Sequence, residues 1–355
     1  MVSLYVVSFE PYSGKSAICL GLGLHYKEKG LNVRYLKPVS TVTVVEGKKT
    51  SRDPAFLREK LGLKESPDEM SPVLISLDNL EEMLGAPKNV WQDKVQKAFQ
   101  KISSSKSQLI LLEGANNLSQ GYSLNLSAGH VVKLLNAKSL LVLLYKPDLA
   151  IDEILDAREH LGGSLIGVMM NKVPRGLIRK VSGDMKRIMG RYQIPITGIL
   201  PEDNILSSIT VNELAEILGG QVICVNDYSE NLVENFAVGA MNVDQALTYF
   251  RRIPRKAVIT GGDRADIQVA ALETDTRCLI LTGNLYPPQA VLTQAAIQHV
   301  PIIIVSMATM ETVRKVDEAL GHVSLRHKNQ ITRLLEMIES QPGLKELSES
   351  LGLPV

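Results

Sequence analysis

Short apolar runs alternate with segments of helical spacing along the first 200 residues. Residues 4–7 form a β-rich run, a turn follows, and residues 17–29 have helical spacing that ends at Gly30. Further apolar runs lie at 31–36, 108–113, 139–145, 165–173 and 195–201. Buried strands that alternate with helices are typical of a parallel sheet covered on both faces. The pattern predicts an α/β domain over residues 1–203, built on a doubly wound parallel sheet.

The pattern restarts near residue 204. Helices are expected over 211–218, 231–236 and 243–251, and strands over 221–225, 256–260, 278–282 and 301–306. Each of the last three strands ends in a hydroxyl residue before a turn or helix, so their carboxyl ends would form adjacent anion-binding edges. A second, smaller α/β domain is predicted over 204–322. Residues 323–355 are expected to be a C-terminal amphipathic helix and a polar tail.

The loop after the first strand carries Ser13, Gly14, Lys15 and Ser16 in succession. Backbone N–H groups of a loop that opens onto a helix N-terminus bind anions. Lys15 would reach the β/γ-phosphates, and the hydroxyl of Ser16 would ligate Mg²⁺. The full pattern asks for glycine where the chain has Phe9, which leaves a plain βα turn as the alternative. The strand before the loop and the helix after it favour a phosphate-binding loop.

Two charged residues, Lys37 and Glu113, lie where they would approach this loop, and a third, Asp53, precedes a candidate helix. Lys37 follows the second strand, and its alternative role is a solvated lysine at a strand end. Asp53 precedes Pro54, where it would cap a helix. Glu113 ends an apolar strand at a glycine turn, as a Walker-B-like metal ligand does, and would lie level with Lys15 on a neighbouring strand.

A glycine-rich turn in the second half carries Gly261, Gly262, Asp263 and Arg264. The glycines allow close backbone approach, and Arg264 would clamp a phosphate or carboxylate. Asp263 or Asp266 would cap the next helix. The turn predicts a small-molecule site in the second domain. The alternative is a tight βα turn with an internal Asp–Arg pair.

Composition narrows the class of protein. The 355 residues are 45% hydrophobic and 22% charged, with a net charge of +1, so nothing favours binding to nucleic acid or to a membrane. No leader or membrane-spanning run is seen, and a cytoplasmic location is expected. The three cysteines and six histidines show no disulfide or zinc spacing. Residues 66–88 are expected to be an irregular surface excursion, with a lid or dimer arm as the alternative.

The ordered motifs Ser13-Gly-Lys-Ser, Leu36-Lys-Pro-Val, Leu112-Glu-Gly-Ala and Met170-Asn-Lys-Val resemble those of the dethiobiotin synthetase family of P-loop proteins. The resemblance covers about residues 1–203 and implies ATP and Mg²⁺ as cofactors. It implies that Lys15 binds phosphate, that Lys37 neutralises the transferred phosphoryl group or an acyl oxygen, and that Asn171 contacts the adenine. It also implies three metal ligands, namely Ser16, Asp53 and Glu113.

Residues 205–322 resemble the DRTGG domain, and the order of the two domains is similar to that in the N-terminal portion of long phosphate acetyltransferases. An acyltransferase domain is not expected to fit after Gly321. The chain departs from the synthetase family at Pro11 and at Asn116-Asn117, where that family has a glycine-rich substrate turn. Three hypotheses follow: an ATP-binding regulatory or sensor protein, an ATP-dependent ligase, and a scaffold for a separate acyltransferase partner. A homodimer is the expected assembly.

Overall fold

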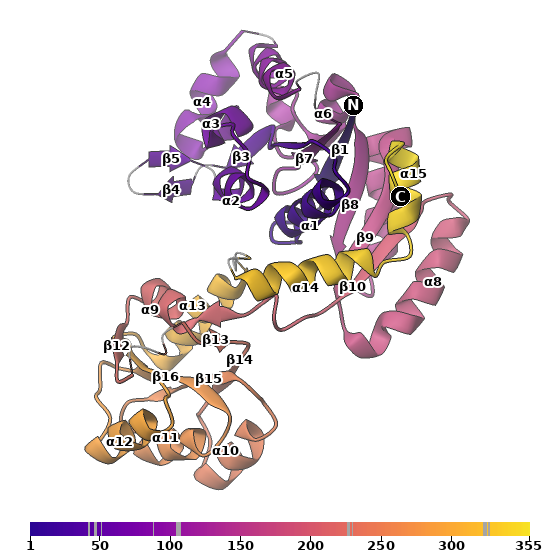
Figure 1. Ribbon diagram of the computed structural model, residues 1–355. Coiled ribbons are helices and arrows are strands. Elements are labelled where there is room, and N and C mark those ends of the chain that lie inside the picture. The colour runs from indigo at the N-terminus through magenta and orange to yellow at the C-terminus, as the bar shows by residue number, and fades with distance from the viewer. Residues whose placement is uncertain are drawn as a thin grey trace. The chain divides into compact units, whose positions relative to one another are not determined.

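The computed structural model describes residues 1–41, 43–45, 48–50, 52–87, 89–103, 108–225, 228, 230–321, 325 and 327–355 (Figure 1). These residues form two compact units: unit 1 comprises residues 1–202 and 331–355, and unit 2 comprises residues 203–330. Within the described ranges, no helix has the length and apolar character needed to cross a membrane.

Unit 1 is built on a six-stranded parallel sheet with the order β10-β9-β8-β1-β7-β2. Its strands are β1 (Val2–Val7), β2 (Val33–Leu36), β7 (Leu109–Glu113), β8 (Lys138–Leu144), β9 (Leu165–Val173) and β10 (Ile196–Pro201). β1 lies between β7 and β8, and Val6 pairs with Glu113. The predicted α/β fold is confirmed, and the carboxyl ends of β1, β7 and β2 meet along one edge.

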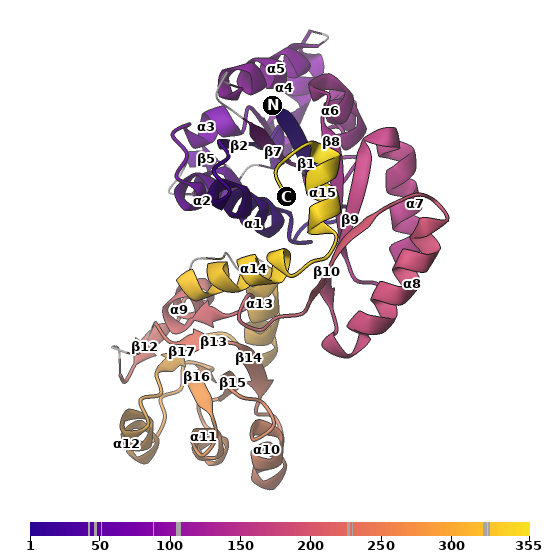
Figure 2. The ribbon, with the colours of Figure 1, turned by 45° about the vertical axis from the view of Figure 1, so that its right-hand side comes forward.

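Helices cover both faces of this sheet (Figure 2). The crossover from β1 to β2 carries α1 (Lys15–Glu28), against which α2 (Arg52–Leu61) packs. The crossovers that run in the opposite direction carry α5 (Val90–Ile102), α6 (Ala128–Leu135), α7 (Ala150–Leu161) and α8 (Ile178–Gly190). Right-handed connections place these helices on the face opposite α1. Three short 3₁₀ turns complete the unit, at Tyr122–Leu124, Gly162–Ser164 and Arg175–Leu177.

Residues 39–85 add small elements beside the sheet. β3 (Val39–Thr41) pairs in parallel with β6 (Val73–Ile75), and β4 (Thr43–Val45) pairs with β5 (Lys48–Thr50). Two short helices, α3 (Pro67–Met70) and α4 (Leu77–Gly85), flank β6. The irregular excursion expected over residues 66–87 is therefore wrong, because Met70 and Val73 are fully buried and order the segment. Lys88 lies outside the described residues.

The C-terminal segment belongs to unit 1 and is not a polar tail. After α14 (Lys328–Glu339), the helix α15 (Leu344–Leu351) packs against β9 and β10. Tyr26 on α1 shares a 2.9 Å hydrogen bond with Ser348. Gly21 of α1 leaves the space that Ile338 occupies, since a Cβ there would lie 2.1 Å from the Ile338 Cδ1 atom. The segment therefore covers part of the sheet, next to α1 and on the same face as α1.

Unit 2 is a second α/β layer structure whose sheet has the order β12-β17-β16-β15-β14. β14 to β17 are parallel, and β12 is antiparallel to β17. The strands are β12 (Gln221–Ile223), β14 (Asn235–Val238), β15 (Lys256–Gly261), β16 (Thr276–Thr282) and β17 (Ile302–Ile304). A separate antiparallel ladder joins β11 (Ile209–Thr210) to β13 (Leu232–Val233). The expectation of a helix over 231–236 is therefore wrong, because Val233 pairs with β11 and Phe236 pairs with β15.

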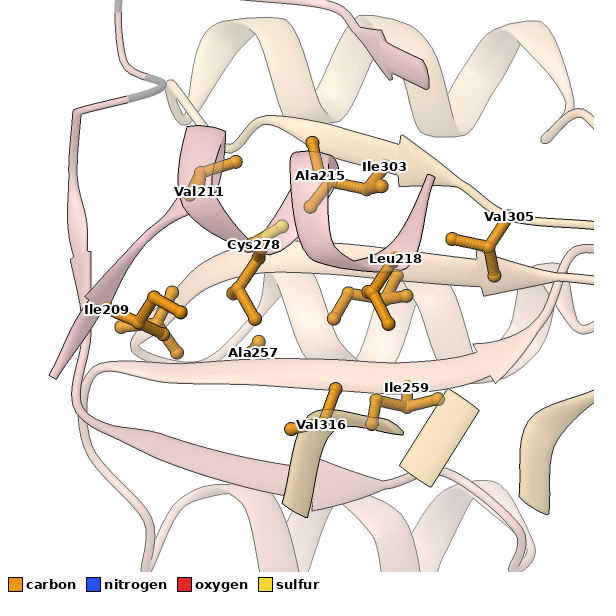
Figure 3. Packing of buried hydrophobic residues seen from close by; sticks show 13 residues of the cluster. Ile209, Val211, Ala215, Leu218, Ala257, Ile259, Cys278, Ile303, Val305 and Val316 are labelled. Atoms are coloured by element: carbon orange, nitrogen blue, oxygen red, sulfur yellow. The ribbon is translucent and has the colours of Figure 1, made fainter. Parts of the chain in front are cut away.

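Two apolar clusters hold the helices of unit 2 to its sheet. Figure 3 shows the first, in which Val211, Ala215 and Leu218 of α9 (Val211–Leu218) pack with Ile303 and with Val316 of α13 (Thr309–Gly321). The second cluster holds α10 (Val243–Phe250), α11 (Ala265–Leu272) and α12 (Gln289–Ile297) against the other face. The sheet is therefore covered on both sides, as predicted for the second domain.

Candidate functional site

The loop between β1 and α1 has the local geometry of an anion-binding turn. Gly14 has φ 102°, a left-handed conformation that favours glycine, and a Cβ there would lie 2.4 Å from the Asn171 Nδ2 atom. α1 begins at Lys15, and the Ile18 amide donates to the Gly14 carbonyl oxygen at 2.9 Å, so the amides of Lys15, Ser16 and Ala17 precede the first backbone hydrogen bond of the helix. Among the described residues, the buried hydroxyl of Ser13 has no hydrogen-bond partner. The loop therefore offers free donors to an anion.

Lys15 is folded back along this loop. Its Nζ donates to Ser8 Oγ at 2.7 Å and to the Glu10 carbonyl oxygen at 3.2 Å. The side chain is buried, and burial lowers the pKa of Lys15 to about 8, although the nearby Glu113 carboxylate acts in the opposite direction. An anion bound at the loop would favour the charged form of this lysine.

Ser16, Lys37, Asp53 and Glu113 converge at the same edge. Ser16 Oγ donates to Glu113 Oε1 at 2.9 Å and to Asp53 Oδ1 at 3.3 Å. Lys37 Nζ donates to Glu113 Oε1 at 2.8 Å and also to Asp53 Oδ2. One ammonium group is therefore shared by two carboxylates, which leaves one surplus negative charge.

The pKa shifts of Lys37 and Asp53 favour the charged forms of these two side chains. Burial would lower the pKa of Lys37, but Glu113 and Asp53 outweigh it and raise that pKa above its ordinary value. Burial would raise the pKa of Asp53, yet the charge and hydrogen bond of Lys37 bring it below its usual range. The alternative role of Lys37 as a solvated lysine is wrong, because its side chain is only 8% exposed.

The donor set suits Mg²⁺. The described residues contain no group of three or more His, Cys, Asp or Glu side chains that would hold a metal ion by themselves. Ser16, Asp53 and Glu113 supply one hydroxyl and two carboxylates, all of them hard oxygen donors. Mg²⁺ is commonly held by one or two carboxylates together with waters and substrate phosphates, so these residues fit the implied ion.

Asp53 does not cap a helix, contrary to the expectation. α2 begins at Arg52, so Asp53 lies inside the first turn, and its carboxylate points to Ser16 and Lys37. Its role is decided by the contacts with Ser16 and Lys37, which lie far from it in the sequence. The residues around Asp53 do not predict these contacts.

Tyr35 is a site residue that the sequence analysis missed. It is fully buried, and its hydroxyl donates to Glu113 Oε2 at 2.9 Å. A signal was available, because residues 35 and 37 are two apart and side chains along a strand alternate between faces. Lys37 and Tyr35 therefore approach Glu113 from the same side of β2.

Asn171 lies beside the phosphate-binding loop. Its Nδ2 donates to the Ser13 carbonyl oxygen at 2.9 Å, and its Oδ1 accepts from the Lys172 amide at 2.9 Å. Both ends of the amide are therefore engaged by the chain. Its contact with adenine stays a prediction.

The turn after Glu113 is closed by its own side chains. The Asn116 amide donates to Gln120 Oε1 at 2.8 Å. Asn117 Oδ1 accepts from the amides of Ser119 and Gln120 at 3.0 and 2.8 Å. The backbone amides of Asn116, Ser119 and Gln120 are therefore all engaged by side chains of the turn itself.

The glycine-rich turn of unit 2 is also paired internally. The guanidinium of Arg264 donates to both Asp266 oxygens at 3.0 Å and to the Met241 carbonyl oxygen at 3.0 Å. At Gly262, a Cβ would lie 2.2 Å from the Leu285 carbonyl oxygen, so glycine is required for packing. The residue that caps α11 is Arg264, so neither Asp263 nor Asp266 is the cap. Ligand binding by Gly261, Gly262, Asp263 and Arg264 stays a prediction.

The fold and the cluster around the loop define a P-loop α/β protein with a second α/β domain. Residues 2–210 match the sequence model of an AAA domain family, and residues 213–319 match that of the DRTGG domain. The first match covers more than half of the chain, so the chain belongs to this AAA domain family, with a dethiobiotin synthetase-like P-loop domain followed by a DRTGG domain.

Two relatives have sequences similar to that of this chain. The chain is 22% identical to a phosphate acetyltransferase of Synechocystis over 355 residues, which cover 96% of this chain and 50% of that protein. It is 26% identical to the ATP-dependent dethiobiotin synthetase BioD of Methanococcus vannielii over 47% of this chain and 78% of that protein. The MinD cell division protein of Aquifex aeolicus is a structural match with a TM-score of 0.35 over 58% of this chain and 84% of that protein. The chain thus spans about half the length of the phosphate acetyltransferase.

Proposed function

We propose that this protein binds ATP with Mg²⁺ and acts as a regulatory or sensor protein related to the N-terminal region of phosphate acetyltransferases. The observation that carries the proposal is the convergence of Ser16, Lys37, Asp53 and Glu113 on one edge beside Lys15. Burial of several charged side chains costs desolvation free energy, and clusters of this kind occur more often at functional sites than elsewhere.

Each residue has a role in this proposal. The loop amides and Lys15 bind the phosphates, and Ser16, Asp53 and Glu113 hold Mg²⁺, which neutralises phosphate charge. In the absence of a ligand, the Lys37 ammonium group contacts the carboxylates of Asp53 and Glu113. When the metal is bound, Lys37 supplies a positive charge near the terminal phosphate. The Asn171 amide, next to Ser13, contacts the base.

The turn at Asn116-Asn117 favours regulation over ligation. In the family that the sequence resembles, the corresponding turn is glycine-rich and binds the substrate carboxylate. Here its backbone donors are bonded to Asn117 and Gln120 side chains. A carboxylate substrate would have to displace these bonds, so this turn is not prepared for a substrate carboxylate.

An ATP-dependent ligase is the second candidate, because the charged residues that phosphoryl transfer requires are together. Positioning and charge neutralisation supply most of the catalysis in such reactions. In either case, we propose that unit 2 binds a second small ligand at the turn formed by residues 261–264. The part of the phosphate acetyltransferases that this chain does not match makes a separate acyltransferase a candidate partner.

The test is calorimetric titration of ATP, with Mg²⁺ or with EDTA, into the wild type and a Lys15→Ala variant, with phosphate release followed in the same samples. Lys29→Ala is the matched control, since Lys29 is an exposed lysine at the other end of α1. We expect Mg²⁺-dependent binding by the wild type and by Lys29→Ala, and its loss in Lys15→Ala.

The phosphate measurement separates the candidates. ATP binding without phosphate release supports a sensor function. Phosphate release that is stimulated by a pool of carboxylates or amines would support the ligase function instead. If the wild type does not bind ATP, both candidates are wrong, and copurification with an acyltransferase becomes the next measurement.

A further inference from the structure

Glu113 is held by two separate sets of partners, one for each carboxylate oxygen. Oε1 accepts from Ser16 Oγ at 2.9 Å and from Lys37 Nζ at 2.8 Å. Oε2 accepts from the Tyr35 hydroxyl at 2.9 Å. The first oxygen therefore faces the site, and the second faces the interior of the sheet.

Tyr35 is placed to hold this orientation. It lies on β2, next to β7, with Tyr35 paired to Leu111 and Leu36 paired to Leu112. The exposure of Tyr35 and of Glu113 is 1% each, so no water competes for their hydrogen bond. A hydrogen bond to a charged group in a buried place is among the stronger ones in proteins.

We infer that Tyr35 is a positioning residue that restricts Glu113 to a single oxygen for the cation, and thereby favours Mg²⁺ over Ca²⁺. The inference rests on the proposed Mg²⁺–ATP function. Ca²⁺ accepts bidentate carboxylates and up to eight ligands, whereas Mg²⁺ is smaller and demands a near-ideal octahedral set. A carboxylate with one oxygen tied to the protein suits the smaller ion.

The test is Tyr35→Phe, which keeps the buried ring and removes the hydroxyl. ATP affinity is measured by calorimetry in EDTA, in saturating Mg²⁺ and in saturating Ca²⁺. The metal increment is the ratio of the Kd in EDTA to the Kd with each metal. Because changes behind a metal ligand typically cost about 10- to 100-fold in metal affinity, we expect the Mg²⁺ increment to fall about 10-fold or more. The Ca²⁺ increment is expected to stay or rise.

Tyr26→Phe is the matched control. Tyr26 is also a fully buried tyrosine of unit 1, and its hydroxyl is bonded to Ser348, away from the metal ligands. Both variants lose one buried hydrogen bond, and the loss of thermal stability is expected to be larger for Tyr35→Phe, because its bond is to a carboxylate. Only Tyr35→Phe is expected to change the metal increments.

The outcomes are distinct. If Tyr35→Phe keeps the wild-type increments for both metals, or changes them no more than Tyr26→Phe does, Tyr35 is a packing residue and the inference alone is wrong. If the wild type binds ATP with no Mg²⁺ increment, the proposed metal site and this inference are both wrong.

Discussion

Both units carry a parallel sheet with glycine turns at its carboxyl edge, but the two edges differ in charge. In unit 1, Lys37, Asp53 and Glu113 share a buried network. In unit 2, Thr260 and Thr282 donate to backbone carbonyl oxygens, and Arg264 is bonded to Asp266 at the surface. The same topology therefore carries a buried charged network in one unit and an internally paired turn in the other, because the side chains at the edge, and not the fold, decide its chemistry.

Two buried lysines make the same contrast. Burial lowers the pKa of Lys15 and of Lys256 to about 8 in each case. Lys15 lies at the carboxyl edge of its sheet, beside the phosphate-binding loop. Lys256 begins β15 at the opposite end of its sheet, where its Nζ donates to Thr274 Oγ1 at 2.8 Å and to the Asp275 carbonyl oxygen at 3.1 Å. A perturbed pKa alone does not locate a functional site.

The largest expected effect is that of Glu113→Gln at the charged edge. The substitution leaves Lys37 buried with half of its partners, and breaking a buried ion pair costs about 3 kcal/mol or more. Urea unfolding followed by the fluorescence of Trp91, the single tryptophan, would measure this loss in unit 1. The Mg²⁺ increment of ATP binding is expected to disappear. Retention of that increment would exclude Glu113 as a metal ligand.

The next effect tests which unit depends on the C-terminal segment. Leu347 of α15 is fully buried, and truncation of a buried leucine costs about 2–5 kcal/mol. We expect Leu347→Ala to destabilise unit 1, measured by Trp91 fluorescence, and to leave unit 2 unchanged. Glu346→Ala on the exposed side of α15 is the control. A loss confined to the calorimetric transition of unit 2 would contradict the assignment of this segment.

A smaller loss of stability is expected for Gly262→Ala, at the glycine-rich turn of unit 2. The added Cβ would lie 2.2 Å from the Leu285 carbonyl oxygen. Overpacking of this kind costs about 1–3 kcal/mol. Scanning calorimetry is expected to show a lower transition temperature for unit 2 and unchanged ATP binding. If ATP binding is lost as well, ATP binding in unit 1 depends on the packing of unit 2, and the two edges are not independent.

The smallest effect concerns pH. Lys256 has a pKa of about 8 in the folded protein and an ordinary value of 10.5. Between these values the unfolded chain binds more protons, so this lysine makes the unfolding free energy rise as pH increases from about 8. The transition temperature of unit 2 in the wild type relative to Lys256→Met is therefore expected to be higher at pH 9.5 than at pH 7.5. An unchanged difference would mean that Lys256 titrates normally.

The sequence alone was enough for the parallel sheets and for most of the charged edge. Ser13, Gly14, Lys15 and Ser16 adjoin a strand and a helix, which is a local arrangement. Glu113 and Lys37 each follow an apolar strand, and the carboxyl ends of parallel strands must meet at one edge. These inferences need only periodicity and the rules of sheet connection.

Only the tertiary structure assigned the residues whose partners lie far along the chain. Asp53 lies in the first turn of α2, and its contacts are with Ser16 of α1 and with Lys37, which follows β2. Residues 231–236 form strands because a sheet edge was available to pair with them.

The C-terminal segment is the clearest case of this division. Its helical spacing is visible in the sequence, but the surface that it packs against is not. Ile338 fits over Gly21, more than 300 positions earlier in the chain, because glycine leaves room there and because α1 alone does not cover its face of the sheet. Periodicity determines that a helix has an apolar face. Shape and uncovered area elsewhere in the fold decide what that face packs against.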